Sequence, residues 1–600
     1  MSDGDTTRAR PSWPRWAGLA VLLLLTAGIY ARVLSFEFLQ TDDPYYLTER
    51  PEFQALADGE DGALAALLSP RKALAGEYWE YYPVRDLSHA LEVKLAGLDP
   101  AVTHGTQLGL HLVFVVLVFL LGLRLGLPPW AALGGAAAVA LHPLAVEPVS
   151  WVSSRKDVLM SVLVLASLLC FSEVLRGRGR ARIGWWAAAA ALALLAFGSK
   201  GPGIVVVPLM IWLVAHERPS AGRRQLALGI GALALAAIAW FLMVRHVGQV
   251  NEIFWEHPDG VGRWFRALGV PVRLVDWYIA PRGLCPYYGP WTSAWYADPY
   301  AWLGFLVVTV GIAALRRCGW RIPRGVFLAG AFVLAVLPAS GVVAVAHLRA
   351  DRFYYLALAF AGLGVGQVGA WAWEWGGSLA LPRRYAARGV AAVLAAVLFL
   401  GWIATSHFQI PNWRNQDAMW GRVMEILPEK HFVLAVRAEQ LMAADRQEDA
   451  RELLHRALEV ADRSPQKKGR FYRAGGYRDV LWTAHIWLLL GESWSRTAAR
   501  TAGSEAAEAA HRARISLQQS VAADPEYVPT YFFEQARAAA YAEDGPAVLA
   551  WSGKLREIPG ITATAGARLA AALEVDGHPA FAAAVRDQWR VLPGPRGRDQ

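Results

Sequence analysis

The sequence predicts an all-α protein in which a polytopic helical membrane domain is followed by a helical-repeat domain. Three observations lead to this fold class. The 600 residues are 55% hydrophobic and only 18% charged, with a mean hydropathy of +0.28. Such a composition is typical of a membrane protein with many spans. About eleven apolar runs of spanning length lie before residue 407, and the chain after residue 408 is charged, Ala-rich and periodic. We therefore predict a membrane domain at 1–407 and a repeat domain at 408–600.

The membrane domain begins with a basic N-terminus that leads into an apolar run from Trp16 to Leu34. No small-residue cleavage pattern follows this run, so we expect a retained anchor and not a removed signal peptide. The segment 263–282 is too polar to span and is expected to be interfacial or re-entrant, anchored by Trp264, Phe265, Trp277 and Tyr278. The predicted spans lie at about 16–34, 105–126, 130–146, 157–175, 184–198, 202–215, 225–244, 299–315, 325–346, 353–374 and 388–406.

The positions of the basic connections predict an orientation. With eleven spans, all the strongly basic connections fall on one face, which the positive-inside rule makes cytoplasmic. The same loops account for most of the net charge of +9, so we do not expect nucleic acid as a partner. The outward connections then include a large first loop at 35–104. The Ala- and Arg-rich composition suggests a bacterial inner membrane, with the C-terminal repeats in the periplasm.

The outward loops hold polar residues that membrane orientation does not explain. Acids, bases and cations that converge on one membrane face predict a functional site. These candidates are Asp42, Asp43, Arg85, His89, His104, His142, Glu147, Arg155, Lys156, Asp157, Lys200, Arg349, Asp351 and Arg352.

Asp42 and Asp43 follow the first span directly, in the segment Thr41-Asp42-Asp43-Pro44. A pair of carboxylates is expensive to keep beside a bilayer, which favours a chemical role. The structural alternative is an Asx turn before Pro44. Two adjacent side chains cannot point the same way. We therefore expect one to act as a base and the other to orient it or to bind a cation, and we favour Asp42 as the base.

The tail repeats with a period of 34 residues. Prolines recur at 525, 559 and 593, and apolar positions recur in the same phase. A helix–turn–helix period of this length is typical of tetratricopeptide-like repeats, and a generic helical tail is the alternative. An earlier unit is expected at about 434–465, and 466–500 is expected to be an insertion or a divergent repeat. The apolar triplets in phase are Ala513, Ala547 and Phe581; Leu517, Trp551 and Val585; and Val521, Leu555 and Trp589.

A series of short motifs runs along the chain at 41–44, 81–89, 97–104 with His111, 141–157, 200–202, 349–356 and Trp413-Arg414-Asn415. In the order of these motifs, the chain resembles the GT-C superfamily of membrane glycosyltransferases, and within it the group with transmembrane spans and tetratricopeptide repeats that includes O-mannosyltransferases and bacterial relatives. The resemblance covers about residue 16 to the end. It departs from the family at Pro83, which lacks a preceding Arg, and at Gly201, where relatives often carry Glu.

This resemblance implies an inverting transfer of a sugar from a polyprenyl-phosphate donor to a protein or glycan hydroxyl on the extracytoplasmic face. Asp42 or Asp43 would supply the base. The donor phosphate would bind to cations, and further polar residues would contact substrates. The implied phosphate ligands are Arg155, Lys156, Lys200, Arg349 and Arg352. The implied further substrate contacts are Arg85, His89, His104, His142 and Glu147.

Several alternatives remain open at this stage. Arg155 and Lys156 could simply complement a helix start, Lys200 could extend to the interface, and Arg349 and Arg352 could pair with Asp351. His142 and Glu147, with His104 or Asp43, could bind a divalent metal, and no cofactor is otherwise implied. The three cysteines form neither a disulfide framework nor a zinc pattern.

The aromatic segment 277–296 favours an interfacial belt, with stacking on a sugar ring as the alternative. The main functional alternative for the whole chain is a non-catalytic membrane scaffold that works through its repeats in envelope or glycan assembly. A transporter ranks third, because its polar residues would be expected at mid-membrane and not at one face. Membrane lipids, and a protein that binds the repeats, are the remaining expected partners.

Overall fold

The computed structural model divides into two compact units, Met1–Arg422 and Val423–Gln600. The residues it describes are 13–590, apart from 76–77, 79, 178, 220–221, 251–260, 289–294, 318, 320–321, 343–349, 464–478, 499, 502, 524–527, 542–543, 558–562 and 576. Within those residues every regular element is a helix, which confirms the predicted all-α class. The unit boundary lies fifteen residues beyond the domain limit that we predicted at 407.

Each of the eleven predicted spans corresponds to a helical segment, but the described helices differ in length. Eight are long and apolar enough to cross a membrane, or nine if one bent pair counts as a single span. The eight are α1 (Trp13–Tyr30), α6 (Pro100–Arg124), α9 (Arg155–Arg176), α10 (Gly179–Ser199), α12 (Arg223–Val250), α14 (Pro299–Arg317), α16 (Tyr355–Ser378) and α17 (Leu381–Gln409).

The remaining three segments are interrupted by proline-containing turns. The helices α7 (Pro129–Ala140) and α8 (Val146–Ser150) form the bent pair, with an angle of 56° between the two segments. The short helix α11 (Val206–Glu217) follows a 3₁₀ turn that contains Pro202, and α15 (Arg324–Val336) ends in a 3₁₀ turn that contains Pro338. Proline cannot donate an amide hydrogen bond, so these turns shorten the α-helical part of each segment.

The spans pack closely where small residues face one another. A Cβ atom added at Gly366 of α16 would clash with the carbonyl oxygen of Ala131 in α7, and one at Gly362 would clash with that of Gly135. Small residues let the backbones of membrane helices approach in this way. This crossing packs α16 against α7. It brings the turn Asp351–Tyr354, which precedes α16, near α8, which follows α7.

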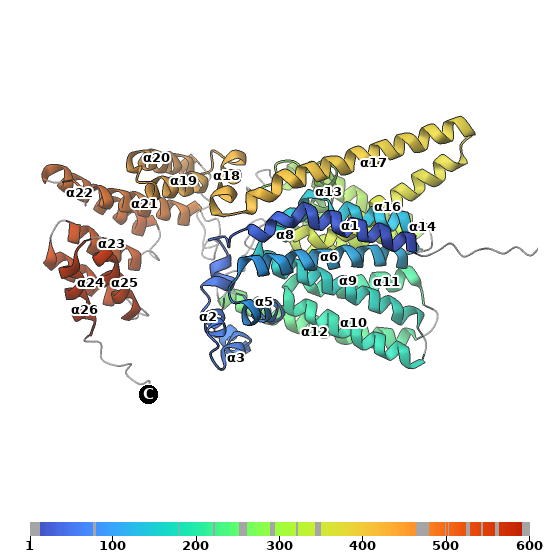
Figure 1. Ribbon diagram of the computed structural model, residues 1–600, viewed down its shortest axis with the longest axis horizontal. Coiled ribbons are helices and arrows are strands. Elements are labelled where there is room, and N and C mark those ends of the chain that lie inside the picture. Colours follow the sequence, from blue (N-terminus) through green and yellow to red (C-terminus); the bar gives the residue numbers. More distant parts are fainter. Residues whose placement is uncertain are drawn as a thin grey trace, which may run out of the picture. The chain divides into compact units, whose positions relative to one another are not determined.

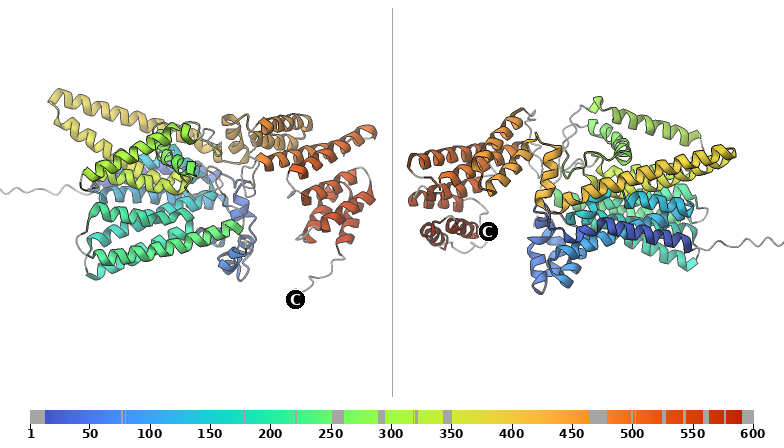
Figure 2. Two further views of the ribbon diagram at one scale, coloured as in Figure 1. Left: turned by 180° about the vertical axis from the view of Figure 1, so that it is seen from behind. Right: turned by 45° about the horizontal axis from the view of Figure 1, so that its top comes forward.

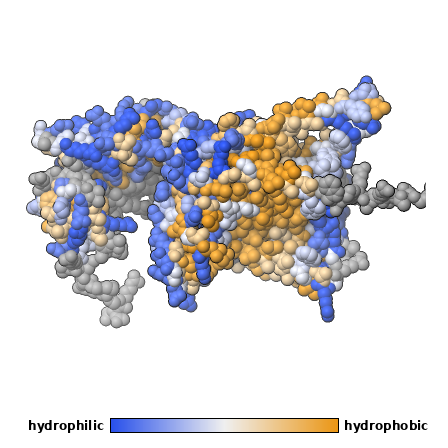
Figure 3. Space-filling view, viewed as in Figure 1, coloured by the Kyte–Doolittle hydropathy of each residue, from blue (hydrophilic) through white to orange (hydrophobic). Residues whose placement is uncertain are grey.

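The loops gather at two ends of the helix bundle, because successive spans run in alternating directions. Figures 1 and 2 show the first-loop helices α2 (Pro51–Ala57), α3 (Ala63–Leu67) and α5 (Pro83–Ala96) together at one end. The short helix α4 (Pro70–Leu74) contacts α12. Figure 3 shows a broad hydrophobic surface over the spans, with hydrophilic residues on both sides of it. This surface has the pattern expected of a membrane protein.

The segment that we predicted to be interfacial forms α13 (Val261–Ile279), which is not among the described helices that qualify as spans. It contains Pro271 and crosses α14 where Gly269 lies against Ala301 and Gly304 against Leu268. This agrees with a segment that packs beside the spans without crossing on its own.

The second unit consists of helix pairs. The helices α24 (Gly545–Glu557) and α26 (Pro579–Arg590) are the second members of the last two pairs. They begin 34 residues apart, as the predicted period requires. Leu517, Leu555, Val585 and Trp589 of the repeating positions are buried. The three periodic prolines lie outside the described residues. The remaining helices are α18 (Gln416–Ile426), which crosses the unit boundary, α19 (His431–Ala443), α20 (Gln447–Arg463), α21 (Asp479–Ala498), α22 (Gly503–Ala523), α23 (Val528–Tyr541) and α25 (Ala563–Val575).

Where the earlier repeat is predicted, the chain forms the helix pair α19 and α20. The predicted packing residues Ala450, Leu454 and Ala457 lie in a buried core that α19 and α20 share with α21. The stretch 466–500, predicted to be an insertion or a divergent repeat, contains α21 from Asp479 onward. The helix pairs have the arrangement that a tetratricopeptide-like solenoid needs, and the assignment to that repeat class stays a prediction.

Candidate active site

The two adjacent aspartates have different surroundings. Asp43 is 1% exposed. Its carboxylate accepts hydrogen bonds from the backbone N–H of Leu39 at 2.7 Å, the backbone N–H of Ser153 at 3.2 Å and the hydroxyl of Ser153 at 2.5 Å. Asp42 is half-buried, and its carboxylate accepts no hydrogen bond from the residues that the structure describes. Asp43 therefore ties the first loop to the turn before α9, and Asp42 is left available.

The local sequence explains why the pair takes this shape. Pro44 starts the single helical turn Pro44–Thr48, so Asp43 lies at its N-cap and the chain bends there. The preceding extended residues return toward Asp43, which lets Leu39 donate to it. The hydrogen bonds of Asp43 come from Leu39 and Ser153, and its side chain makes no capping bond to the turn that follows, so neither aspartate forms the Asx turn offered as the structural alternative.

Burial raises the pKa of Asp43 to about 7, against the opposing effect of its hydrogen bonds from Ser153 and Leu39. An unfolded aspartate titrates near ~3.9. Between these values the folded state holds a proton that the unfolded state has released. We therefore expect the free energy of unfolding to fall as pH rises from about 4 to about 7, and to level off above that range. Thermal unfolding measured across this range should show the slope in the wild type.

The Asp43→Asn variant should lose this slope, and Asp61→Asn, which changes an exposed carboxylate of the same loop, should keep it. An unchanged slope in Asp43→Asn would assign the titration to another group.

Two cations lie near Asp42, and a third lies near those two. Burial raises the pKa of Asp42, while the positive charges of Arg352 and Lys156 lower it. Burial lowers the pKa of Lys200, and so do the charges of Lys156 and Arg352, against the attraction of Asp157. Lys156, Lys200 and Arg352 are therefore close enough to influence one another, and Asp42 lies in the field of two of them. We call Asp42 with these three cations the charge cluster.

Each cation of the charge cluster already has a carboxylate partner. The Nζ of Lys156 lies 2.6 Å from Oε2 of Glu80, and the Nζ of Lys200 lies 2.5 Å from Oδ1 of Asp157. Arg352 donates to Oε1 of Glu147, whose Oε2 accepts the backbone N–H of Asp351 at 2.9 Å. Glu147 therefore binds both the start of the turn Asp351–Tyr354 and the guanidinium of Arg352, which gives it a supporting place behind that cation.

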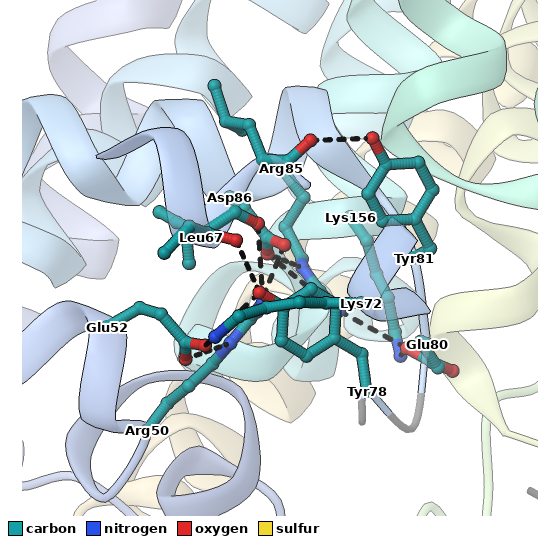
Figure 4. Close-up of polar contacts among 12 residues, drawn as sticks. Arg50, Glu52, Leu67, Lys72, Tyr78, Glu80, Tyr81, Arg85, Asp86 and Lys156 are labelled. Atoms are coloured by element: carbon teal, nitrogen blue, oxygen red, sulfur yellow. Dashed lines mark hydrogen bonds and ion pairs between the residues drawn. The ribbon is translucent and has the colours of Figure 1, made fainter. Parts of the chain in front are cut away.

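Arg85 belongs to a buried chain of ion pairs that leads to the charge cluster (Figure 4). Its guanidinium lies 3.2 Å from Glu80 and 2.7 Å from Asp86, and Asp86 lies 3.0 Å from Arg50. Although burial acts to raise it, the charges of Lys156 and Arg85 lower the pKa of Glu80 to about 2. Glu80 is therefore ionised and joins Arg85 to Lys156.

Arg155 lies apart from the charge cluster, although it is adjacent to Lys156 in sequence. It is fully buried and donates to Glu92 at 2.6 Å, to Gln107 at 2.6 Å and to the carbonyl oxygen of Thr103 at 2.9 Å. These contacts join α9 to α5 and α6.

The predicted histidines are buried in structural surroundings. His89 lies 3.4 Å from Glu92, and His104 packs edge-on against Phe36. Nε2 of His142 lies 2.9 Å from the carbonyl oxygen of Tyr278, and Nδ1 accepts the N–H of Leu144 at 3.1 Å. Its ring also stacks on Tyr278, with the centroids 4.2 Å apart. Both nitrogens of His142 are thus engaged within the protein.

Two other predicted features have different outcomes. Arg349 lies outside the described residues. In the described part of the chain, no group of three or more His, Cys, Asp or Glu side chains is arranged to hold a metal ion. In the aromatic segment, Tyr278 stacks on His142 and Tyr287 stacks on Trp420 with centroids 5.1 Å apart, so both rings pack within the protein.

Sequence reasoning missed several residues at this end of the bundle, above all Glu80, Asp86, Glu92 and Ser153. Glu80 offered one usable signal, because it is an acid inside an aromatic stretch that leads into the Pro83 helix start. The others are ordinary helix or turn residues, and each of them has a partner far away in sequence: Arg50 for Asp86, Arg155 for Glu92 and Asp43 for Ser153.

Comparison with known proteins gives one match to a family model. The model described as dolichyl-phosphate-mannose-protein mannosyltransferase matches residues 94–243, from the end of α5 into α12. This match confirms the predicted resemblance to lipid-linked sugar transferases over that stretch, which includes Lys156 and Lys200. Asp42 and Arg352 lie outside it. No curated protein sequence matches the chain.

Solved structures give weaker similarities. ArnT from Cupriavidus metallidurans bound to undecaprenyl phosphate is 16% identical with a TM-score of 0.35, covering 70% of this chain and 81% of that one. The Archaeoglobus fulgidus oligosaccharyltransferase tethered with an acceptor peptide is 12% identical with a TM-score of 0.39, covering 73% of this chain and 59% of that one. The present chain thus matches less than two thirds of the oligosaccharyltransferase. At these TM-scores the similarities carry no functional conclusion for this protein.

Proposed function

We propose that this protein is a membrane glycosyltransferase that moves a sugar from a polyprenyl-phosphate donor to a hydroxyl of a protein or glycan. The observation that carries the proposal is the charge cluster, where the carboxylate of Asp42 makes no hydrogen bond within the described residues and lies in the field of Arg352 and Lys156. A base beside several cations is what transfer from a phosphate-linked sugar requires. The family-model match over residues 94–243 supports this chemistry.

In the proposed reaction the oxygen of the acceptor hydroxyl attacks the anomeric carbon of the donor sugar. Asp42 takes the hydroxyl proton as the new carbon–oxygen bond forms. The bond between the anomeric carbon and the phosphate oxygen breaks, and its electron pair leaves on the phosphate. Lys156, Lys200 and Arg352 stabilise that negative charge. Attack from the side opposite the phosphate inverts the anomeric configuration.

The remaining predicted site residues have supporting places in this scheme. Asp43 holds the loop that carries Asp42, and Glu147 holds Arg352. Arg85 acts on Lys156 through Glu80. Arg155, with His89, belongs to the buried contacts between helices, and Arg349 stays a predicted phosphate contact. We further propose that this end of the bundle faces the periplasm of a bacterial inner membrane.

The proposal is tested with the purified full-length chain in detergent and a radiolabelled polyprenyl-phosphate sugar, offered with membrane extracts as the source of acceptors. The wild type should transfer the label and release free polyprenyl phosphate. Lys200→Gln removes a charge from the phosphate site and should raise the donor KM by about tenfold or more, since a hydrogen bond to a charged group contributes ~1.5–3 kcal/mol.

The matched control is Lys94→Gln, which changes an exposed lysine of α5 and should leave the donor KM unchanged. Absence of transfer by the wild type with a panel of polyprenyl-phosphate sugars would overturn the proposal and favour the scaffold alternative. Equal effects of the two variants would remove Lys200 from the phosphate site.

A further inference from the structure

The segment that follows the last span packs onto the candidate active site. We call residues 410–422 the strap. Its composition placed it in the predicted tail, yet Ile410, Trp413, Met419 and Trp420 are all buried within the first unit. The buried side chains belong to a short turn, Ile410–Trp413, and to the beginning of α18.

Trp413 reaches Arg352 through one intermediate ring. The rings of Trp413 and Trp151 are stacked, with centroids 5.5 Å apart and an angle of 25° between the planes. The guanidinium carbon of Arg352 lies 4.7 Å from the centroid of the same Trp151 ring. Cation–π contacts of this kind stabilise a guanidinium most strongly where water is excluded, and Trp151 is buried. Trp151 therefore stacks on Trp413 of the strap and also makes the cation–π contact with Arg352.

The strap also holds the loop that carries Asp42. The carbonyl oxygen of Arg414 accepts the backbone N–H of Glu37 at 2.9 Å, five residues before Asp42. Further along the strap, the ring of Trp420 stacks on Tyr287, and Nε of Arg422 donates to the carbonyl oxygen of Leu284 at 3.2 Å. Two consecutive strap residues therefore contact neighbours of the charge cluster: Trp413 contacts Trp151, which carries Arg352, and Arg414 contacts the segment that precedes Asp42.

We propose that Trp413 is a positioning residue that fixes Arg352 through Trp151, so that the strap sets the place of the phosphate-binding arginine relative to Asp42. The inference rests on the proposed function, because it assigns to Arg352 the donor phosphate as its ligand. Without the Trp413 ring, Trp151 loses its stacking partner, so the Trp151 ring on which the guanidinium of Arg352 lies is no longer held in place. The contacts of Arg352 with Glu147 and with the Phe353 ring remain. Loss of this orientation weakens phosphate binding and leaves the base in place.

The experiment is a double-mutant cycle between Trp413 and Arg352 in the full-length chain. Trp413→Ala should lower kcat/KM for the polyprenyl-phosphate sugar by about tenfold, the magnitude of a desolvated cation–π contact. Trp413→Phe keeps a stacking ring and should restore most of the loss. In the Arg352→Lys background, Trp413→Ala should have little further effect, because the contact that it orients is already gone. Additive effects in the two backgrounds would overturn the inference.

Two controls separate positioning from general damage. Trp375→Ala removes an exposed tryptophan near the far end of α16 and should leave kcat/KM unchanged. If Trp413→Ala does not fold, Trp413→Leu keeps apolar volume without the ring and enters the cycle in its place, with folding followed by thermal unfolding.

The same cycle is measured on equilibrium binding of free polyprenyl phosphate, which needs no catalysis. Binding that shows the coupling without any sugar transfer would support the inference while the proposed function fails. If the wild type transfers sugar but neither kcat/KM nor binding shows coupling between Trp413 and Arg352, the inference is rejected and the proposed function stands. A wild type that binds no polyprenyl phosphate would overturn both.

Discussion

Replacing Asp42 with Asn is expected to lower the rate of sugar transfer by about 10²- to 10⁴-fold, the contribution typical of a general base. Asn is nearly the same size as Asp, but it cannot accept a proton from the acceptor hydroxyl. Since Asp42 makes no hydrogen bond with its side chain among the described residues, the change should leave folding intact. Transfer is measured at saturating donor, and thermal unfolding is measured on the same preparation.

Asp58→Asn is the matched control, because Asp58 is an exposed carboxylate of the same loop. It should keep the wild-type rate. Asp43→Asn should also slow transfer, but together with a lower melting temperature, since Asp43 holds the loop through Ser153 and Leu39. Wild-type transfer by both the Asp42 and the Asp43 variants would show that the pair has no part in catalysis.

The second large effect concerns folding. Arg155→Met should lower the free energy of unfolding by about 3–5 kcal/mol, because removing one partner of a buried ion pair leaves an uncompensated buried charge. The charge left behind is that of Glu92, and Gln107 and the carbonyl of Thr103 lose their donor as well. The yield of monodisperse protein and the thermal unfolding midpoint in detergent measure the loss.

A control lies at the other end of the same helix. Arg176 of α9 is half exposed and pairs with Glu217 at 2.9 Å, so Arg176→Met should cost only about 0–1 kcal/mol. Adding Glu92→Leu to Arg155→Met should recover part of the stability, since it removes the stranded charge. If Arg155→Met instead folds normally and raises the donor KM, Arg155 binds phosphate as the resemblance implied.

The helical class and the positions of the apolar segments could be predicted from the sequence, because spanning length and hydrophobicity are local properties. The lengths of individual helices could not all be predicted. Pro202 and Pro338 leave the apolar pattern unbroken while they replace α-helix with short 3₁₀ turns. The division between the two compact units at residue 422 could not be predicted either, because the strap is polar enough to resemble the tail until its contacts are known.

The sequence predicts a set of polar residues on one membrane face, which stays a prediction, and the separate places of its members could not be predicted. Adjacent helix residues point about 100° apart, so Arg155 turns into the bundle while Lys156 turns toward Glu80. The sequence contains no local mark of this difference, because the carboxylates that receive the two cations lie in distant parts of the first loop and α5. The same holds for Asp42 and Asp43, because the hydrogen bonds from Ser153 and Leu39 that bury Asp43 are not visible in the sequence.

The pairing of Lys156, Lys200 and Arg352 with carboxylates has a consequence for turnover. The resting site is close to electroneutral, so an arriving phosphate exchanges places with carboxylates that are already present. When the spent polyprenyl phosphate departs, Glu80, Asp157 and Glu147 can return to the cations, and no bare positive charge is left against the bilayer. The carrier is therefore expected to be a weak product inhibitor, and the site is ready for the next donor as soon as it has gone.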